Sequence, residues 1–121
     1  MGLDMYANTT NRRISSPVDF KGRDSDPLIH QWRKHPNLHG WMEELYRRKG
    51  GKQQFNCTTV QLTSDDVDSL ERAIETGALP ETVGFFFGVT DGTEKDDDLE
   101  FIAKARAALA DGLTVYYHSW W

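Results

Sequence analysis

Segment 32–42 holds the chain's densest group of side chains able to bind or transform a ligand. It reads Trp-Arg-Lys-His-Pro-Asn-Leu-His-Gly-Trp-Met. Indole rings stack on planar groups, cationic side chains donate charge-assisted hydrogen bonds to anions, and imidazole changes protonation state near neutral pH. These residue types predict a ligand-binding site here, although they form no known catalytic signature.

A bend at Pro36 would bring these groups together. Proline disfavours a helical residue before it, so we expect a turn there and a new helix capped by Asn37. The free backbone amides of the first helical turn suit a bound anion. Trp32, or Trp120 from the end of the chain, would stack on a planar group. The predicted ligand-binding residues are Trp32, Arg33, Lys34, His35, Asn37, His39 and Trp120.

Packing accounts for part of the same pattern. Trp41 and Met42 fall on a helical apolar stripe, Trp32 would cover a preceding helix, and the cationic pair would be solvated. If the Pro36 bend is not the site, the alternative is a sheet face that carries Asp4, Tyr6, His118 and Trp120. The terminal pair Trp120-Trp121 must in any case pack, bind a ligand or meet a partner, because chain ends otherwise fray.

Other chemistry is weakly indicated. The histidines at 30, 35, 39 and 118 lack the regular spacing of a zinc site, and the acidic residues 91 and 96–98 lack the spacing of a calcium loop, so we expect no metal. No cofactor motif is recognised. The lone Cys57 is interpreted as a small buried hydrophobe rather than a nucleophile. The catalytic residues, if any, are unknown.

Composition indicates one folded domain spanning residues 1–121, with 38% hydrophobic and 27% charged residues. A net charge of -5 disfavours duplex nucleic acid, while basic residues concentrated in 12–52 suit a small anion. The apolar runs are too short to span a membrane, and an acidic residue stands where a signal peptide would be basic. We therefore expect a cytoplasmic protein without a membrane partner.

Periodicity and capping residues predict an α+β fold. The expected sheet has about four strands, mostly antiparallel or mixed, and carries three to four helices. The expected strands are 3–10, 55–62, 83–89 and 113–121, and the expected helices are 26–34, 37–49, 63–77 and 96–112. The polar segment 11–24 is expected to be a surface loop.

Four segments resemble a family of small uncharacterised bacteriophage and bacterial proteins. They are the start Met-Gly-Leu-Asp-Met-Tyr-Ala, segment 32–42, the run 84–88 with Asp91-Gly92, and the Tyr-His-Ser-Trp-Trp end. Members are sometimes labelled phosphoglycerate kinase, an activity not expected of a chain this short without a nucleotide loop. The resemblance implies a phage or prophage context, with the host cytoplasm as location, and supplies no catalytic residue.

The leading functional hypothesis is binding of a small anionic or nucleotide-like molecule without turnover. One alternative is a protein-interaction module, such as an inhibitor of a host factor or a homo-oligomer that uses the terminal tryptophans. Another is a small hydrolase with His35 or His39 as general base, oriented by Asp4. Whether the protein is an enzyme stays open, with non-enzymatic binding favoured.

Overall fold

The computed structural model describes residues 2–84, 88 and 92–121. The described elements are, in chain order, β1 (Asp4–Thr10), β2 (Leu28–Arg33), α1 (Pro36–Arg48), β3 (Thr59–Leu62), α2 (Ser64–Thr76), α3 (Lys95–Ala110) and β4 (Thr114–Trp120). In this part of the chain no helix has the length and apolar character needed to cross a membrane.

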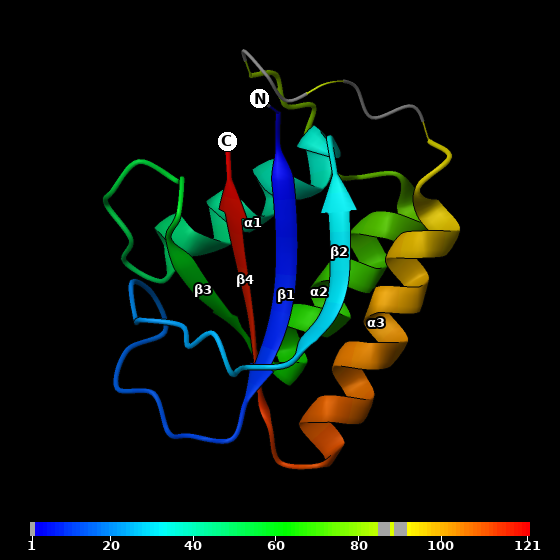
Figure 1. Cartoon of the computed structure of the whole chain (residues 1–121). Helices are drawn as coiled ribbons and strands as arrows, with labels where there is room; N and C mark the ends of the chain where they lie inside the picture. The colour runs from blue at the N-terminus through cyan, green and yellow to red at the C-terminus, as the bar shows by residue number, and fades with distance from the viewer. Residues whose placement is uncertain (1, 85–87, 89–91) are drawn as a thin grey trace.

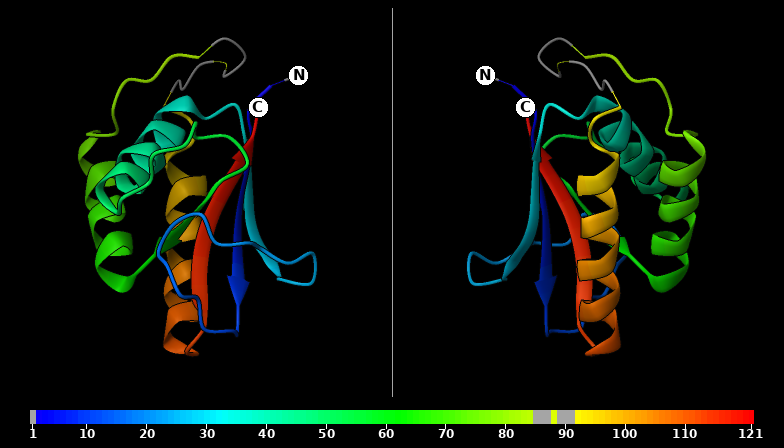
Figure 2. Two further views of the ribbon diagram at one scale, coloured as in Figure 1. Left: turned by 90° about the vertical axis from the view of Figure 1, so that its left-hand side faces the viewer. Right: turned by 90° about the vertical axis from the view of Figure 1, so that its right-hand side faces the viewer.

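The strands form one antiparallel sheet in the order β2-β1-β4-β3. The helices cover one face of this sheet, so the molecule has two layers (Figures 1 and 2). Figure 1 views the sheet from the face that carries no helix, which we call the open face. This arrangement confirms the predicted α+β class and the mainly antiparallel sheet.

Alternation along the strands sorts side chains between the two faces. On β1, Met5 and Ala7 are fully buried under the helices, and on β4 so are Val115 and Tyr117. Neighbouring residues in a strand point to opposite sides, so the intervening side chains face outward. Pairing of Tyr6 with His118 and of Asn8 with Tyr116 places four polar or aromatic side chains together on the open face.

The helix signals in the sequence are confirmed for three helices. Thr63 caps α2 through a capping box with Asp66, and Gly77 ends it in a left-handed conformation at φ 69°. Three aspartates precede the apolar positions of α3, where they offset the positive end of the helix dipole. Helix α1 begins with Pro36, and its N-cap is His35 rather than the predicted Asn37.

The predicted helix 26–34 is wrong, because Leu28–Arg33 forms strand β2. Asp26 and Pro27 suggested a helix start, yet the Asp26 carboxylate accepts a hydrogen bond from the backbone amide of Arg23 instead. The following residues alternate, with His30 and Trp32 buried and Gln31 exposed. Pairing with β1 satisfies the backbone groups of this segment and overrides its helix signal.

Two other predicted strands differ from what the structure shows. The strand expected over 55–62 begins only at Thr59, after a turn in which Cys57 is exposed and has a left-handed φ of 60°. The expectation of a buried cysteine is therefore wrong. In the run 83–89, Val83, Gly84 and Gly88 belong to no strand and are exposed, while 85–87 and 89 lie outside the described residues.

The long connection 11–27 follows the sheet rather than leaving it. Val18 bridges to Val60 at the outer edge of β3, where Asp19 and Gln61 donate further backbone hydrogen bonds. The chain then crosses the open face to reach β2, and this crossing is visible in front of the sheet in Figure 1. We call residues 20–27 the crossing loop.

Candidate functional site

The Pro36 bend places His35 in the interior. His35 and Asp98 are each 2% exposed, and His35 Nε2 lies 2.8 Å from a carboxylate oxygen of Asp98. The other oxygen of Asp98 accepts a hydrogen bond of 3.0 Å from the indole of Trp32. This arrangement connects β2 and the start of α1 to α3, and it makes two predicted ligand-binding residues parts of a buried polar cluster.

His39 is also a core residue. Its Nδ1 lies 2.7 Å from the hydroxyl oxygen of Tyr117, and the side chain is sandwiched in the aromatic core near Phe55. Burial lowers the pKa of His39 to about 4, so the ring is neutral near pH 7. A neutral histidine facing the interior offers no positive charge to an anion.

The remaining predicted site residues are spread over the surface. Arg33 Nε lies 3.5 Å from Asp4, and both line a hollow of about 350 Å³ with Trp120. Lys34 is exposed, and Asn37 accepts a hydrogen bond from the backbone of Thr82. His35 and Asn37 line a separate hollow of about 440 Å³. The predicted residues therefore do not surround one cradle, and ligand binding by them stays a prediction.

The hydrolase arrangement is not assembled either. Asp4 lies on the open face, whereas His35 and His39 lie on the helix-covered side of the sheet. Asp98, rather than Asp4, contacts the His35 ring. Asp4 therefore cannot orient either histidine as a general base.

A hollow lies on the open face, between the sheet and the crossing loop. It has a volume of about 870 Å³, and we call it the groove. Strands β1 and β4 contribute Tyr6, Tyr116, His118 and Trp120, three of which belong to the alternative face named from the sequence. The crossing loop forms the opposite wall.

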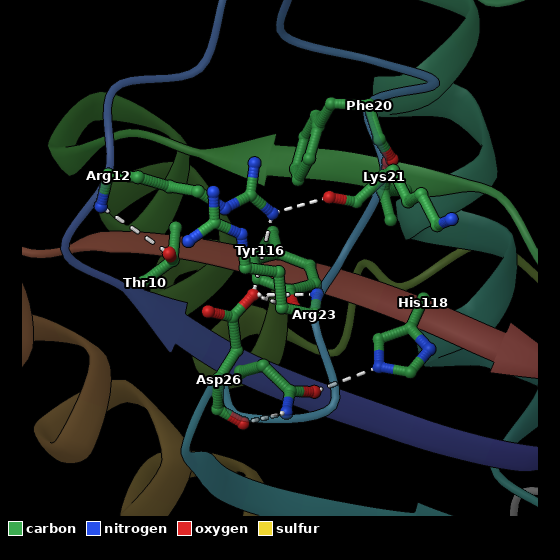
Figure 3. A network of polar contacts seen from close by, with 10 residues as sticks. Thr10, Arg12, Phe20, Lys21, Arg23, Asp26, Tyr116 and His118 are labelled. Carbon is green, nitrogen blue, oxygen red and sulfur yellow. Dashed lines mark hydrogen bonds and ion pairs between the residues drawn. The ribbon is translucent and has the colours of Figure 1, made fainter.

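A buried carboxylate, Asp26, holds the crossing loop on the sheet (Figure 3). The Tyr116 hydroxyl donates to Asp26 Oδ2 at 2.8 Å, and an Arg12 nitrogen lies 3.5 Å from the same atom. Asn8 donates to the backbone carbonyl oxygen of Asp26 at 3.1 Å. The loop is thereby fixed to β1 and β4 by charge-assisted and neutral hydrogen bonds.

This network alters the acidity of its members. Burial alone would raise the pKa of Asp26, but hydrogen bonds from the Arg23 backbone and Tyr116, with the Arg12 charge, lower it below its usual value. Burial, followed by the interaction with Asp26, raises the pKa of Tyr116. Asp26 is therefore ionised and Tyr116 protonated at neutral pH.

The crossing loop also carries positive charge. Arg12 donates to the Lys21 carbonyl oxygen and pairs with Asp26, so it is used within the network. The side-chain nitrogens of Lys21 and Arg23 have no hydrogen-bond or ion-pair partner among residues 2–84, 88 and 92–121. Both line the groove, as does the exposed carboxylate of Asp24.

Gly22 allows the loop to approach the sheet closely. A Cβ at this position would lie 2.7 Å from the Tyr116 hydroxyl oxygen, closer than non-bonded atoms tolerate. The ring of Phe20 packs edge-on against Tyr116 at 5.2 Å between centroids. The crossing loop therefore packs closely against the sheet where it forms the wall of the groove.

In the described part of the chain, His30, Asp97 and Glu100 have potential ligand atoms within 4.8 Å of one another. His30 Nε2 already lies 3.0 Å from Asp97, and its Nδ1 lies 3.3 Å from Lys104 Nζ. An ammonium group can only donate, so Nδ1 accepts from it and Nε2 carries the proton. Hydrogen bonding satisfies this histidine, and we assign no metal to it.

Sequence reasoning missed Asn8, Lys21, Arg23, Asp26 and Tyr116. The crossing loop looked like ordinary polar surface, because its partner in β4, Tyr116, is 90 positions away from Asp26. One available signal was the cluster of basic residues at 12, 13, 21 and 23 beside phenylalanine and glycine. Comparisons with protein-family models, with curated proteins and with solved structures gave no match.

Proposed function

We propose that this protein binds a small planar anion of the nucleotide class in the groove, without chemical turnover. The observation that carries the proposal is the pairing of aromatic side chains on the sheet with two uncommitted cationic side chains on the crossing loop. This keeps the ligand class expected from the sequence and moves its site from the Pro36 bend to the open face.

The aromatic part of the groove offers a stacking surface. Tyr6 and His118 stack at 5.1 Å between ring centroids, with an interplanar angle of 27°. Trp120 follows on the same face and is 65% exposed. An indole this exposed in the free protein gains contact area when a planar ligand covers it.

The cationic part would hold the anion. Lys21 provides a mobile ammonium group and Arg23 a planar guanidinium, which are both common phosphate partners. Neither has to break an ion pair among the described residues before binding. The volume of about 870 Å³ lies in the range of small-molecule sites, which supports a mononucleotide-sized ligand rather than a polymer.

Titration of the ¹⁵N-labelled protein with the four ribonucleoside 5′-monophosphates tests the proposal. We expect amide shifts at groove residues of β1, β4 and the crossing loop. Because two charge-assisted contacts are lost, the double variant Lys21→Ala/Arg23→Ala should bind at least about tenfold more weakly. The neutral nucleosides should also bind more weakly, and added salt should weaken the nucleotides.

The matched control is Arg48→Ala/Lys52→Ala, which removes the same charge at exposed positions outside the groove. It should bind like the unmodified protein. An equal loss of nucleotide affinity in both double variants would show a general effect of the protein's charge. Absence of groove shifts with all four nucleotides at millimolar concentration would contradict the proposal.

A protein-interaction role is our second proposal. It is supported by two large apolar residues along the groove, Trp120 at 65% and Leu28 at 50% exposure. Trp121, in contrast, is partly buried and donates its indole N–H to the Phe55 carbonyl. Sedimentation that reveals a concentration-dependent dimer, lost in Trp120→Ala, would favour this role as self-association.

A further inference from the structure

The side-chain amide of Asn8 has a defined orientation. Its nitrogen lies 3.1 Å from the backbone carbonyl oxygen of Asp26, which can only accept a hydrogen bond. The amide nitrogen must therefore face Asp26, and the amide oxygen must face the opposite direction. That oxygen lies 2.8 Å from Nε2 of His118. Asn8 thus connects the crossing loop to the histidine in the groove.

This orientation determines the tautomer of His118. The Asn8 amide oxygen is an acceptor, so Nε2 of His118 carries a proton and donates it. Burial lowers the pKa of His118, which leaves the ring neutral at pH 7. In the neutral ring the other nitrogen, Nδ1, has a lone pair and no proton. It is therefore a hydrogen-bond acceptor.

The lone pair of Nδ1 is directed along the groove. Figure 3 shows the second ring nitrogen of His118 pointing away from Asn8, toward the carboxyl end of β4. Trp120 and Cys57 line the groove in that region. Within the described residues Nδ1 has no hydrogen-bond partner. Stacking with Tyr6, at 5.1 Å between ring centroids, restrains the ring in this position.

We infer that the groove prefers planar anions whose ring edge carries an N–H or O–H donor, which His118 Nδ1 accepts. The inference rests on the proposed function, since it concerns selectivity within the same groove. Uracil-type rings with an imino N–H fit this requirement, whereas the N-methylated ring presents no donor at that edge. His118 is thus a specificity-determining residue, fixed in its tautomer by Asn8.

The first measurement needs no ligand. Two-dimensional ¹H–¹⁵N spectra of the imidazole ring report which nitrogen is protonated. We expect the Nε2–H form for His118, and a larger fraction of the Nδ1–H form in Asn8→Leu. A predominant Nδ1–H form in the unmodified protein would overturn the inference, whatever the protein binds.

The second measurement compares uridine 5′-monophosphate with 3-methyluridine 5′-monophosphate, which has the same charge and ring but lacks the imino donor. One lost hydrogen bond should weaken binding about five- to tenfold. His118→Phe keeps a ring that stacks and removes the acceptor, so it should bind both probes equally. The variant fold is checked by the amide spectrum.

The outcomes separate the two proposals. Equal affinity of the unmodified protein for both probes would overturn the donor preference while leaving the nucleotide groove in place. Undiminished preference in a folded His118→Phe protein would also overturn it, by assigning selectivity to another residue. Failure of either probe to shift groove amides would count against the proposed function, and with it against this inference.

Discussion

Histidines lie on both faces of the sheet, but in different surroundings. On the helix-covered face, His35 and His39 are buried and contact Asp98 and Tyr117. On the open face, His118 is half-buried and one ring nitrogen is available to the groove. Both regions contain histidine, but the His35 ring is held by Asp98, whereas His118 lines the groove and its Nδ1 has no hydrogen-bond partner among the described residues.

Both regions contain a buried carboxylate, Asp98 on the covered face and Asp26 on the open face. In the Asp98 cluster both carboxylate oxygens have partners, Trp32 for one and His35 for the other. The Asp26 carboxylate is also hydrogen-bonded, but it lies beneath a loop, with cations and aromatic rings around a hollow. We therefore expect substitutions on the covered face to affect stability, and those on the open face to affect loop position and binding.

Asp98→Ala should have the largest effect on stability. It leaves the Trp32 N–H and the buried His35 ring without this carboxylate, and breaking such a buried pair costs about 3–5 kcal/mol. Urea unfolding measures the change. The control is Asp96→Ala in the same first turn of α3, which is exposed and should cost at most about 1 kcal/mol. Similar losses in both variants would show that the cluster is not structurally important.

The pKa of His39 predicts an acid-sensitive core. The folded-state pKa of about 4 lies below the ordinary histidine value of about 6.5, so the unfolded chain binds the proton first as pH falls. Stability from this group is complete above about pH 7 and is lost as pH falls toward 4. Linkage gives about 2 kcal/mol lost between pH 7.5 and 5.

Urea unfolding of His39→Gln at the same two pH values isolates this term. Glutamine does not titrate and retains a polar group near Tyr117, so the loss over this interval should be smaller by about 2 kcal/mol. A parallel pH dependence in the variant and the unmodified protein would assign the acid sensitivity to other groups.

Gly22→Ala should lower stability less than Asp98→Ala does. The expected loss is about 1–2 kcal/mol, because the added Cβ would collide with the Tyr116 hydroxyl. Tyr116→Phe should cost about 1 kcal/mol through its lost hydrogen bond to Asp26. In the double variant the colliding oxygen is absent, so the combined loss should be less than the sum. Ser25→Ala, at an exposed loop position, should leave stability unchanged.

Additive losses in that double-variant cycle would mean that the loop does not rest on Tyr116 through Gly22. Chemical shifts of groove amides provide the second measurement. These shifts should change in Gly22→Ala. In the double variant they should resemble those of Tyr116→Phe alone, because the hydroxyl that the added Cβ would collide with is absent.

The sequence predicted several elements from local chemistry. Alternation in 3–10 and 113–121, the capping box at Thr63 and the aspartates before α3 each act within a few residues, and the structure confirms them. Segment 26–34 was predicted wrongly because its helix-start signal is local, whereas the backbone pairing with β1 that overrides it is not.

The candidate site was predicted only in part, for the same reason. Tyr6, His118 and Trp120 were assigned to one face, since a strand of period two fixes which residues share a side. Lys21, Arg23 and Asp26 were missed, because a polar loop contains no local information about which part of the sheet it will cross.

The sequence by itself determined the α+β class, the approximate ranges of α2 and α3, and the division of β1 and β4 into an inward and an outward face. These follow from hydrophobic periodicity and capping, which operate over a few residues. Only the tertiary structure decided that His35 and His39 are buried while His118 faces a groove. Burial depends on which elements pack against a residue, and here the partners in α3 and β4 are 63 and 78 positions away.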